Sequence, residues 1–194
     1  MTARHAWLAA LALAVVLAGC NRSPEQTGEA AAPAEAPAGA TQPGSAPSEI
    51  PRSLVSIYFP SARESGLVGE EREIFVTQTP GDRIKQIVAD LLSGPTAEGS
   101  LPAVPPGTRL RQAYVIEGGV AYLDFSSELT TLGGGSMAEL LTVYAIVDSV
   151  VANVPEVRRV GLLVDGAPIE TLNGHMDLRR PLPGDLSLVL GAKI

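Results

Sequence analysis

The sequence predicts an α+β domain of two layers, in which two helices pack on one face of a mainly antiparallel sheet. Two observations lead to this prediction. Segments with the two-residue alternation of strands occur in pairs, and two stretches with the 3.6-residue period of a helix separate these pairs. The resulting order is ββ-α-ββ-α-ββ over residues 51–194, and a segment of this length is usual for one domain.

The first predicted strand pair lies at residues 54–59 and 71–78. In both segments alternate residues share a face, as the pleat of a strand requires. The shared face of the first segment is apolar and is formed by Val55, Ile57 and Phe59. In the second segment Arg72, Ile74 and Val76 share one face.

The first helix is predicted to begin at Pro80, because Thr79 and Asp82 fit a capping box and proline is favoured at the first helical position. Gly94 is expected to end it. Its apolar residues recur at the spacing of one helix face, and they are Ile84, Ile87, Val88, Leu91 and Leu92.

The second strand pair is predicted to be a hairpin turning at Gly118 and Gly119, since glycine tolerates the positive φ of a two-residue turn. A second helix follows, with Ser136 and Glu139 as another capping box and Pro155 ending the segment. Apolar residues cover most of its girth, which predicts that it is the more buried of the two helices.

The last strand pair is predicted to begin with Val160, Leu162 and Val164 on one face. Asp165 and Gly166 form the expected turn into a short partner strand at Ile169–Leu172.

The first twenty residues have the pattern of a secretory signal, with a positive start and an apolar run from Ala6 to Ala18 that is too short to span a bilayer. The stretch LAGC that ends at Cys20 resembles the lipobox of bacterial lipoproteins, where the chain is cut before the cysteine and the thiol is acylated. This resemblance implies a signal peptide at residues 1–19 and lipidation of Cys20, by palmitate among other chains. The alternative is an ordinary secreted protein with Cys20 near its cleavage site.

Residues 20–50 are rich in Ala, Pro, Gly, Ser, Thr and Glu and contain too few large apolar residues to offset the entropy of ordering. They are predicted to form a disordered tether between Cys20 and the domain. Without residues 1–19 the chain has 13 basic and 21 acidic residues, a net charge of −8. This charge argues against a nucleic-acid partner, which would require a basic surface.

Seven motifs together resemble the GerMN domain, a sporulation and germination module of bacterial lipoproteins. In chain order they read VSIYFP, LLSGP, PPGTRL, GGVAYLDFSSEL, GGGSMAELL, VRRVGLLVDGAPIETLNGH and DLRRPL, over residues 54–182. The resemblance implies a non-enzymatic envelope domain on a lipoprotein. The chain has one copy of the domain, whereas spore formers can carry two.

The stretch most suggestive of chemistry places His175, Asp177, Arg179 and Arg180 within six residues. His175 could be a base oriented by Asp177, yet nothing nearby in sequence supplies the nucleophile or water that a base needs. The alternatives are a contact with an anion, a glycan or a partner through His175, Arg179 and Arg180, and a structural corner without chemistry.

A second candidate is the carboxylate pair Asp124 and Glu128, at a spacing that a glycosidase could use. Aromatic residues, which stack on sugars in such clefts, make up 4% of the chain, and its one tryptophan, Trp7, lies in the predicted signal peptide. With one cysteine and two histidines the chain offers no evident metal cluster, and no cofactor is predicted.

These observations predict a non-catalytic binding or assembly module, held by lipid to the cell membrane or the outer membrane and facing away from the cytoplasm. The expected partner is an envelope protein, peptidoglycan or another copy of the chain, reached in part by strand addition to a sheet edge. The alternation leaves Arg72, Arg111, Gln112, Tyr122 and Arg159 as candidate exposed strand residues for such contacts, and the alternative is that they form an ordinary solvated, charged sheet face. The alternatives are an envelope hydrolase using His175 or the Asp124/Glu128 pair, and a solute-capture lipoprotein.

Overall fold

A computed structural model describes residues 50–192. The predicted signal peptide, Cys20 and nearly all of the predicted tether lie outside the described residues. The elements are β1 (Arg52–Pro60), β2 (Leu67–Phe75), α1 (Pro80–Ser93), β3 (Leu110–Ile116), β4 (Val120–Phe125), the 3₁₀ helix η1 (Ser127–Thr131), α2 (Ser136–Val151), β5 (Arg159–Val164), β6 (Ala167–Pro168), β7 (Leu182–Pro183) and the 3₁₀ helix η2 (Leu186–Leu188).

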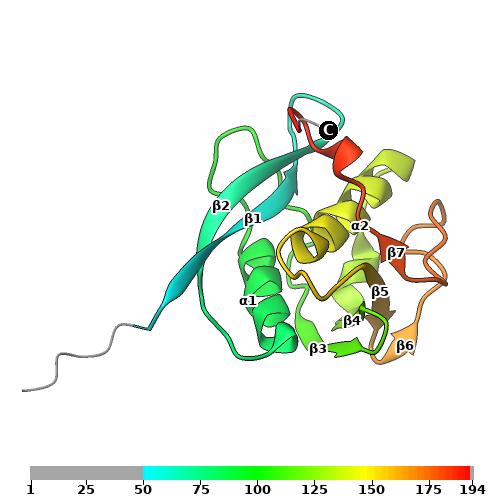
Figure 1. Cartoon of the computed structure of the whole chain (residues 1–194). Coiled ribbons are helices and arrows are strands. Elements are labelled where there is room, and N and C mark those ends of the chain that lie inside the picture. The colour runs from blue at the N-terminus through cyan, green and yellow to red at the C-terminus, as the bar shows by residue number, and fades with distance from the viewer. Residues whose placement is uncertain (1–49, 193–194) are drawn as a thin grey trace, which may run out of the picture. The chain divides into compact units, whose positions relative to one another are not determined.

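The predicted α+β class is confirmed, and the strands divide into two sheets. β1 and β2 form an antiparallel hairpin of their own, and the larger sheet has the order β3-β4-β5-β6, with β7 also paired to β5. β4 and β5 run parallel because α2 connects them, and parallel neighbours need such a crossover. Both helices contact both sheets, so the hairpin lies across the helices on one side and β3–β5 lie on the other (Figure 1).

The predicted apolar faces form the core. Val55, Ile57 and Phe59 on β1 are buried, as are Ala121, Leu123 and Phe125 on β4. On α1 the buried residues form a single stripe, whereas α2 is buried around most of its circumference because sheets lie on two of its sides. The prediction that the second helix is the more buried one is therefore confirmed.

The two predicted helix caps have different outcomes. At α1 the Thr79 hydroxyl accepts a hydrogen bond from the Asp82 N–H at 3.1 Å, which confirms Thr79 as the N-cap. The Asp82 carboxylate binds the Thr79 hydroxyl at 2.8 Å, in place of the Thr79 N–H that a full capping box would use. At α2 the predicted box is wrong, because Gly135 is the N-cap and no side chain caps the helix. Glu139 is unavailable for capping because its carboxylate turns into the interior and binds a distant loop.

The two predicted glycine turns form at the expected positions. Gly118 and Gly119 have the expected positive φ, 86° and 75°, but the predicted two-residue length is wrong, because Ile116 pairs with Val120 and the loop therefore holds three residues. Gly166, in the turn after β5, has φ of 80°.

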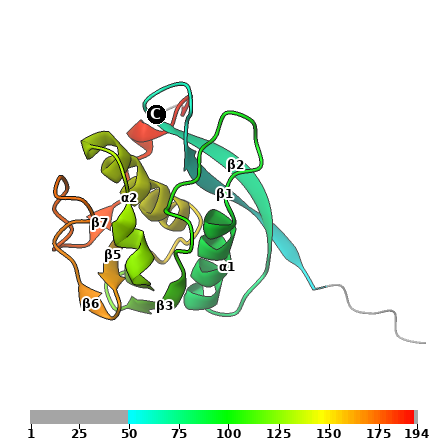
Figure 2. The same ribbon diagram turned by 180° about the vertical axis from the view of Figure 1, so that it is seen from behind.

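The predicted strand at Ile169–Leu172 is wrong. β6 ends at Pro168, where the proline lacks the N–H needed to continue a ladder. The chain then forms a loop and returns to β5 as β7, where Val160 pairs with Leu182. Figure 2 shows this loop beside α2 and β7, on the side of the domain away from the start of β1.

Side chains from the helices close the outer edges of the hairpin. Asn153, after α2, accepts a hydrogen bond from the Ser56 N–H at 2.9 Å and donates to the Ser56 carbonyl at 2.6 Å. On the other edge the Gln86 amide of α1 bonds both the N–H and the carbonyl of Phe75. These groups take the place of a further strand and block strand addition where they bind.

Within residues 50–192 no helix combines the length and apolar character needed to cross a membrane.

Candidate functional site

The stretch that looked most like chemistry folds into a loop organised around one buried carboxylate. Glu139, in the first turn of α2, is 0% exposed. Its Oε1 accepts hydrogen bonds from the Thr171 hydroxyl at 2.5 Å and the Leu172 N–H at 2.9 Å, and its Oε2 accepts one from the His175 N–H at 2.9 Å. One glutamate therefore fixes a whole turn of main chain that lies more than thirty residues further along the sequence.

These bonds also decide the ionisation of Glu139. Burial alone would raise the pKa of its carboxyl group. The hydrogen bonds donated by Thr171, Asn173, His175 and Leu172 outweigh burial and lower this pKa to about 2. Glu139 is therefore an anion at neutral pH, held in place by its donors.

His175 has polar neighbours that position it within the loop. Its Nδ1 lies 2.7 Å from the Asn173 carbonyl oxygen and 3.4 Å from Glu139 Oε2. The side chain of His175 is 41% exposed, so one side of the ring faces solvent. The geometry agrees with the structural-corner interpretation of this stretch and leaves the ring accessible to a partner.

The two arginines of the stretch differ in their surroundings. Arg179 forms a two-pronged pair with Asp177, with Nε and Nη2 each 2.9 Å from a carboxylate oxygen. These hydrogen bonds lower the pKa of Asp177 to about 2. His175, Asp177 and Arg179 line one shallow hollow of about 250 Å³, whereas Arg180 is exposed and does not line this hollow.

Asp124 and Glu128, the carboxylate pair considered for a glycosidase, contact different parts of the structure. Asp124 is buried at the end of β4, and its Oδ1 accepts a hydrogen bond from the Gly166 N–H at 2.8 Å. It therefore fixes the turn between β5 and β6. Glu128 lies in η1, 3.6 Å from the guanidinium of Arg109. The two carboxylates bind different groups in different elements.

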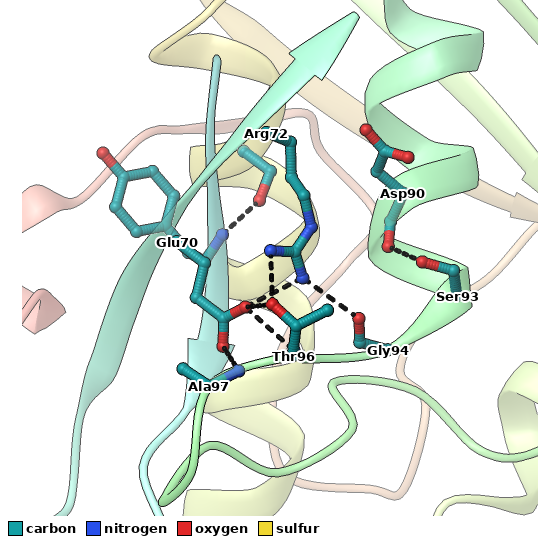
Figure 3. A network of polar contacts seen from close by, with 9 residues as sticks. Glu70, Arg72, Asp90, Ser93, Gly94, Thr96 and Ala97 are labelled. Carbon is teal, nitrogen blue, oxygen red and sulfur yellow. Dashed lines mark hydrogen bonds and ion pairs between the residues drawn. The ribbon is translucent and has the colours of Figure 1, made fainter. Parts of the chain in front are cut away.

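A polar network that the sequence did not indicate joins β2 to the end of α1 (Figure 3). Glu70 is 7% exposed and accepts hydrogen bonds from the N–H groups of Thr96 and Ala97 at 3.0 and 3.2 Å and from Arg72 at 2.8 Å. Burial opposes ionisation of Glu70, but these donors, together with the Ser100 hydroxyl, lower its pKa.

The network corrects the expectation that Arg72 is an exposed strand residue. Its guanidinium lies over the ring of Phe59 at 5.8 Å and also donates to Thr96 Oγ1 and the Gly94 carbonyl, so the side chain is only 17% exposed. The spacing of Glu70 and Arg72, two residues apart on one strand face, is the signal that could have revealed this pair.

Asp148 of α2 is a second buried carboxyl group that the sequence did not single out. Its Oδ1 accepts a hydrogen bond from the Asp185 N–H at 2.7 Å, and its Oδ2 is buried without a hydrogen-bond partner. Burial raises the pKa of Asp148 to about 6, against the opposing effect of the Asp185 hydrogen bond. An aspartate in the mostly apolar second half of α2 was the available signal.

Among residues 50–192 no group of three His, Cys, Asp or Glu side chains is placed to hold a metal ion.

Comparison with solved structures shows that the fold is shared with domains of a sporulation protein and with a protein assigned as a lipoprotein. A crystal structure of a Clostridium perfringens protein assigned as a lipoprotein matches with a TM-score of 0.50 and 23% identity, over 70% of this chain and 89% of that one. The tandem GerMN domains of the Bacillus subtilis sporulation protein GerM match with a TM-score of 0.55 and 14% identity, over 69% of this chain and 46% of that one. The first GerMN domain of GerM alone gives 0.50 and 16%, over 69% of this chain and 96% of that one.

Comparison of sequences gives the family. No curated protein matches the chain. The family model described as Germane, sporulation and spore germination, matches residues 56–170, which is more than half of the chain and includes both helices and the larger part of both sheets. This match confirms the resemblance carried by the seven motifs, and the chain belongs to the Germane family.

Proposed function

We propose that this chain is a lipoprotein anchored through Cys20 to the cell membrane or the outer membrane, with its Germane domain on the side away from the cytoplasm. The domain acts as a non-catalytic binding or assembly module whose partner is an envelope protein, peptidoglycan or another copy of the chain. The family description supports a role in sporulation or germination, and the lipobox-like sequence before Cys20 supports the anchor.

The observation that carries the non-catalytic part of the proposal is how the acidic side chains in the candidate sites and beneath the His175 loop are used. Glu139 binds the main chain of the loop, Asp124 binds the Gly166 N–H, and Asp177 binds Arg179. A general acid or base has to reach a proton on the substrate, and its pKa has to lie near the working pH. Glu139 and Asp177, each with a pKa of about 2, are poorly suited to that work.

The loop from Glu170 to Arg180 is the surface we propose for partner contact. Glu139 holds its main chain, so the loop can present His175, Arg179 and Arg180 without losing much conformational entropy on binding. In the free domain Arg179 is paired with Asp177, so an anionic group, such as a carboxylate on a protein or on the wall polymer, meets the exposed Arg180 and the imidazole directly and competes with Asp177 for Arg179. Because the hairpin edges are blocked by Asn153 and Gln86, side chains of this loop are better placed than those edges to make the contact.

The anchor is tested by intact-mass analysis of the protein from its native membrane. We expect Cys20 to be the N-terminal residue and to carry acyl chains, and Cys20→Ser to release the protein from the membrane. A free thiol at Cys20 in the wild-type protein would contradict the anchor.

The contact surface is tested by photo-crosslinking in cells with a reactive residue at Arg180. Glu98, which is also exposed but lies in the loop after α1, serves as the control position. We expect one discrete product from position 180, lost in an Arg179→Ala variant, and none from position 98. Equal labelling at both positions, or hydrolysis of purified peptidoglycan that is lost in His175→Ala or Asp124→Ala, would contradict the proposal.

A further inference from the structure

An apolar surface lies uncovered at the open end of the β1–β2 hairpin. Ile50, Leu54 and Phe75 are large apolar residues whose exposed fractions are 63%, 62% and 45%. Arg52 pairs with Phe75 in the strand register, and its guanidinium lies 5.1 Å from the centre of the Phe75 ring. Ile50, Leu54, Phe75 and Arg52 are called the hairpin-end patch below.

Three of these residues share one face of the hairpin. Arg52 and Leu54 are two residues apart on β1, so their side chains point to the same side of the strand, and cross-strand partners such as Phe75 point with them. Ile50 joins Arg52 and Phe75 in lining one hollow. Figure 1 shows the start of β1 projecting beyond α1. Gln86 of α1 contacts the main chain of Phe75 here, and the apolar side chains of the patch stay exposed.

The charge of the patch is internally balanced. Glu73 lies opposite Leu54 in the register, and its carboxylate is 3.2 Å from Arg52, with both side chains more than half exposed. The patch therefore presents apolar atoms and one neutralised ion pair. Exposed apolar side chains that gather in one place are typical of surfaces that contact a partner or a membrane.

The position of the patch in the chain indicates what it contacts. The segment that begins at Cys20 enters the domain at Ile50, within the patch, and 29 residues separate the two. Any chain of 29 residues spans at most about 100 Å, and a flexible tether of this length, which the composition predicts here, has a typical end-to-end distance of about 30 Å. Such a tether gives an effective concentration on the order of millimolar, at which even weak docking is populated.

We propose that the hairpin-end patch docks onto the lipid bilayer that holds the acylated Cys20. The proposal rests on the proposed function, because lipidation supplies the proximity. Leu54, Ile50 and Phe75 enter the boundary between headgroups and acyl chains, and Arg52 keeps its charged end at the headgroups while its stem lies along apolar surface. Since the ion pair with Glu73 is neutral, docking depends on apolar contact and varies little with the content of anionic lipid.

Docking also gives the domain an orientation. Both views show the loop that carries His175 on the side of the domain opposite the start of β1 (Figures 1 and 2). With the hairpin end on the bilayer, the proposed contact surface points away from the membrane. The hairpin-end patch would then contact the bilayer while the His175 loop faces partners in the envelope.

The sequence makes a clean spectroscopic test available. Without the signal peptide the chain has no tryptophan, and Cys20 is its only cysteine. The mature chain can be coupled through Cys20 to a maleimide lipid in vesicles of phosphatidylethanolamine and phosphatidylglycerol. Tryptophan is then placed at Leu54, or at Tyr114 as the control, because Tyr114 is exposed to a similar degree, at 42%, but lies on β3.

We expect emission from Leu54→Trp to shift to shorter wavelength on vesicles and to be quenched by brominated lipids, while Tyr114→Trp shows neither effect. To exclude an effect of the introduced indole, Ile50→Trp serves as reporter with and without Leu54→Asp. The charged substitution is expected to lower the docked-to-undocked ratio by about tenfold or more, because it removes a large apolar side chain from the contact.

Three results would overturn the proposal: no quenching at position 54, equal quenching at position 114, or a shift that follows protein concentration without vesicles. The last result would identify the patch as an interface between two copies of the chain. Because the maleimide lipid replaces biological acylation, failure here leaves the proposed anchor intact. An unmodified Cys20 in cells would reject the anchor whatever the vesicles show.

Discussion

Replacement of Glu139 by glutamine tests the central structural claim, that one buried carboxylate holds the His175 loop. The amide has one oxygen where the carboxylate has two, so its NH₂ group must face donors at either Leu172 or His175. The pKa of Glu139 is lowered from 4.5 to about 2 in the folded protein. At about 1.4 kcal/mol per unit, this shift corresponds to about 3 kcal/mol of stability.

The sign of the pH dependence follows from the lowered pKa. The contribution is fully present above pH 4.5, the unfolded value, and is lost as the pH falls towards about 2. We therefore expect the free energy of unfolding of Glu139→Gln at pH 7 to be about 3 kcal/mol lower than that of the wild type, and its Tm to be about 10 °C lower. The difference should shrink as the pH is lowered from about 4.5 towards 2.

Urea titrations followed by circular dichroism at several pH values measure both quantities. Glu98→Gln, at an exposed site, makes the same chemical change and should alter stability by less than about 0.5 kcal/mol. Hydrogen exchange adds a local readout, because amides of the His175 loop should lose protection in Glu139→Gln more than those of β1. A difference from wild type below about 1 kcal/mol, or one that does not change with pH, would refute the reasoning.

Three further predictions concern other particular contacts. Burial raises the pKa of Asp148 from 3.8 to about 6, so ionisation of Asp148 lowers the stability of the wild type as the pH rises through that range. The free energy of unfolding of Asp148→Asn, measured by urea titration, should therefore rise relative to that of the wild type by up to about 3 kcal/mol between pH 4 and pH 7.5. A difference that does not change with pH would contradict this. Gly119→Ala should lower Tm more than Gly118→Ala, because both have positive φ but only at Gly119 would a Cβ lie 2.8 Å from a carbonyl oxygen; equal losses would show that this close approach is unimportant. Asn153→Ala should lower the free energy of unfolding by about 2 kcal/mol, because it removes two hydrogen bonds to the main chain of Ser56. It should also increase self-association in analytical ultracentrifugation, because the edge of β1 at Ser56 is then open to another strand. A variant that stays monomeric at high concentration would show that Asn153 does not block strand addition.

Periodicity and turn chemistry were enough to predict the class, the order of the main elements and much of the core. The apolar faces of β1 and β4, the Thr79 cap of α1 and the position of the Gly118–Gly119 turn all agree with the structure. Each depends on residues within about one helix turn of one another, or on the alternation of a single strand. Such short-range preferences can be read from the residues themselves.

The candidate site was predicted less completely. The sequence placed His175 and Arg179 together correctly, and the structure shows them on one hollow. It assigned Glu139 to the wrong partner, because a Ser-x-x-Glu spacing at a helix start fits a capping box whether or not the glutamate is needed elsewhere. The Glu70 network was missed for a similar reason, since its donors at Thr96 and Ala97 come from a different segment.

By itself the sequence determined the approximate positions of the two helices and of the first five strands, most of the apolar faces, and which stretch resembles a lipoprotein signal. Only the tertiary structure decided that the strands form two sheets, that β4 and β5 run parallel, that the stretch after Pro168 is a loop, and that Glu139 lies beneath that loop. The physical reason is that a buried carboxylate is stable only where several donors converge on it, and here those donors lie 32 to 36 residues away along the chain.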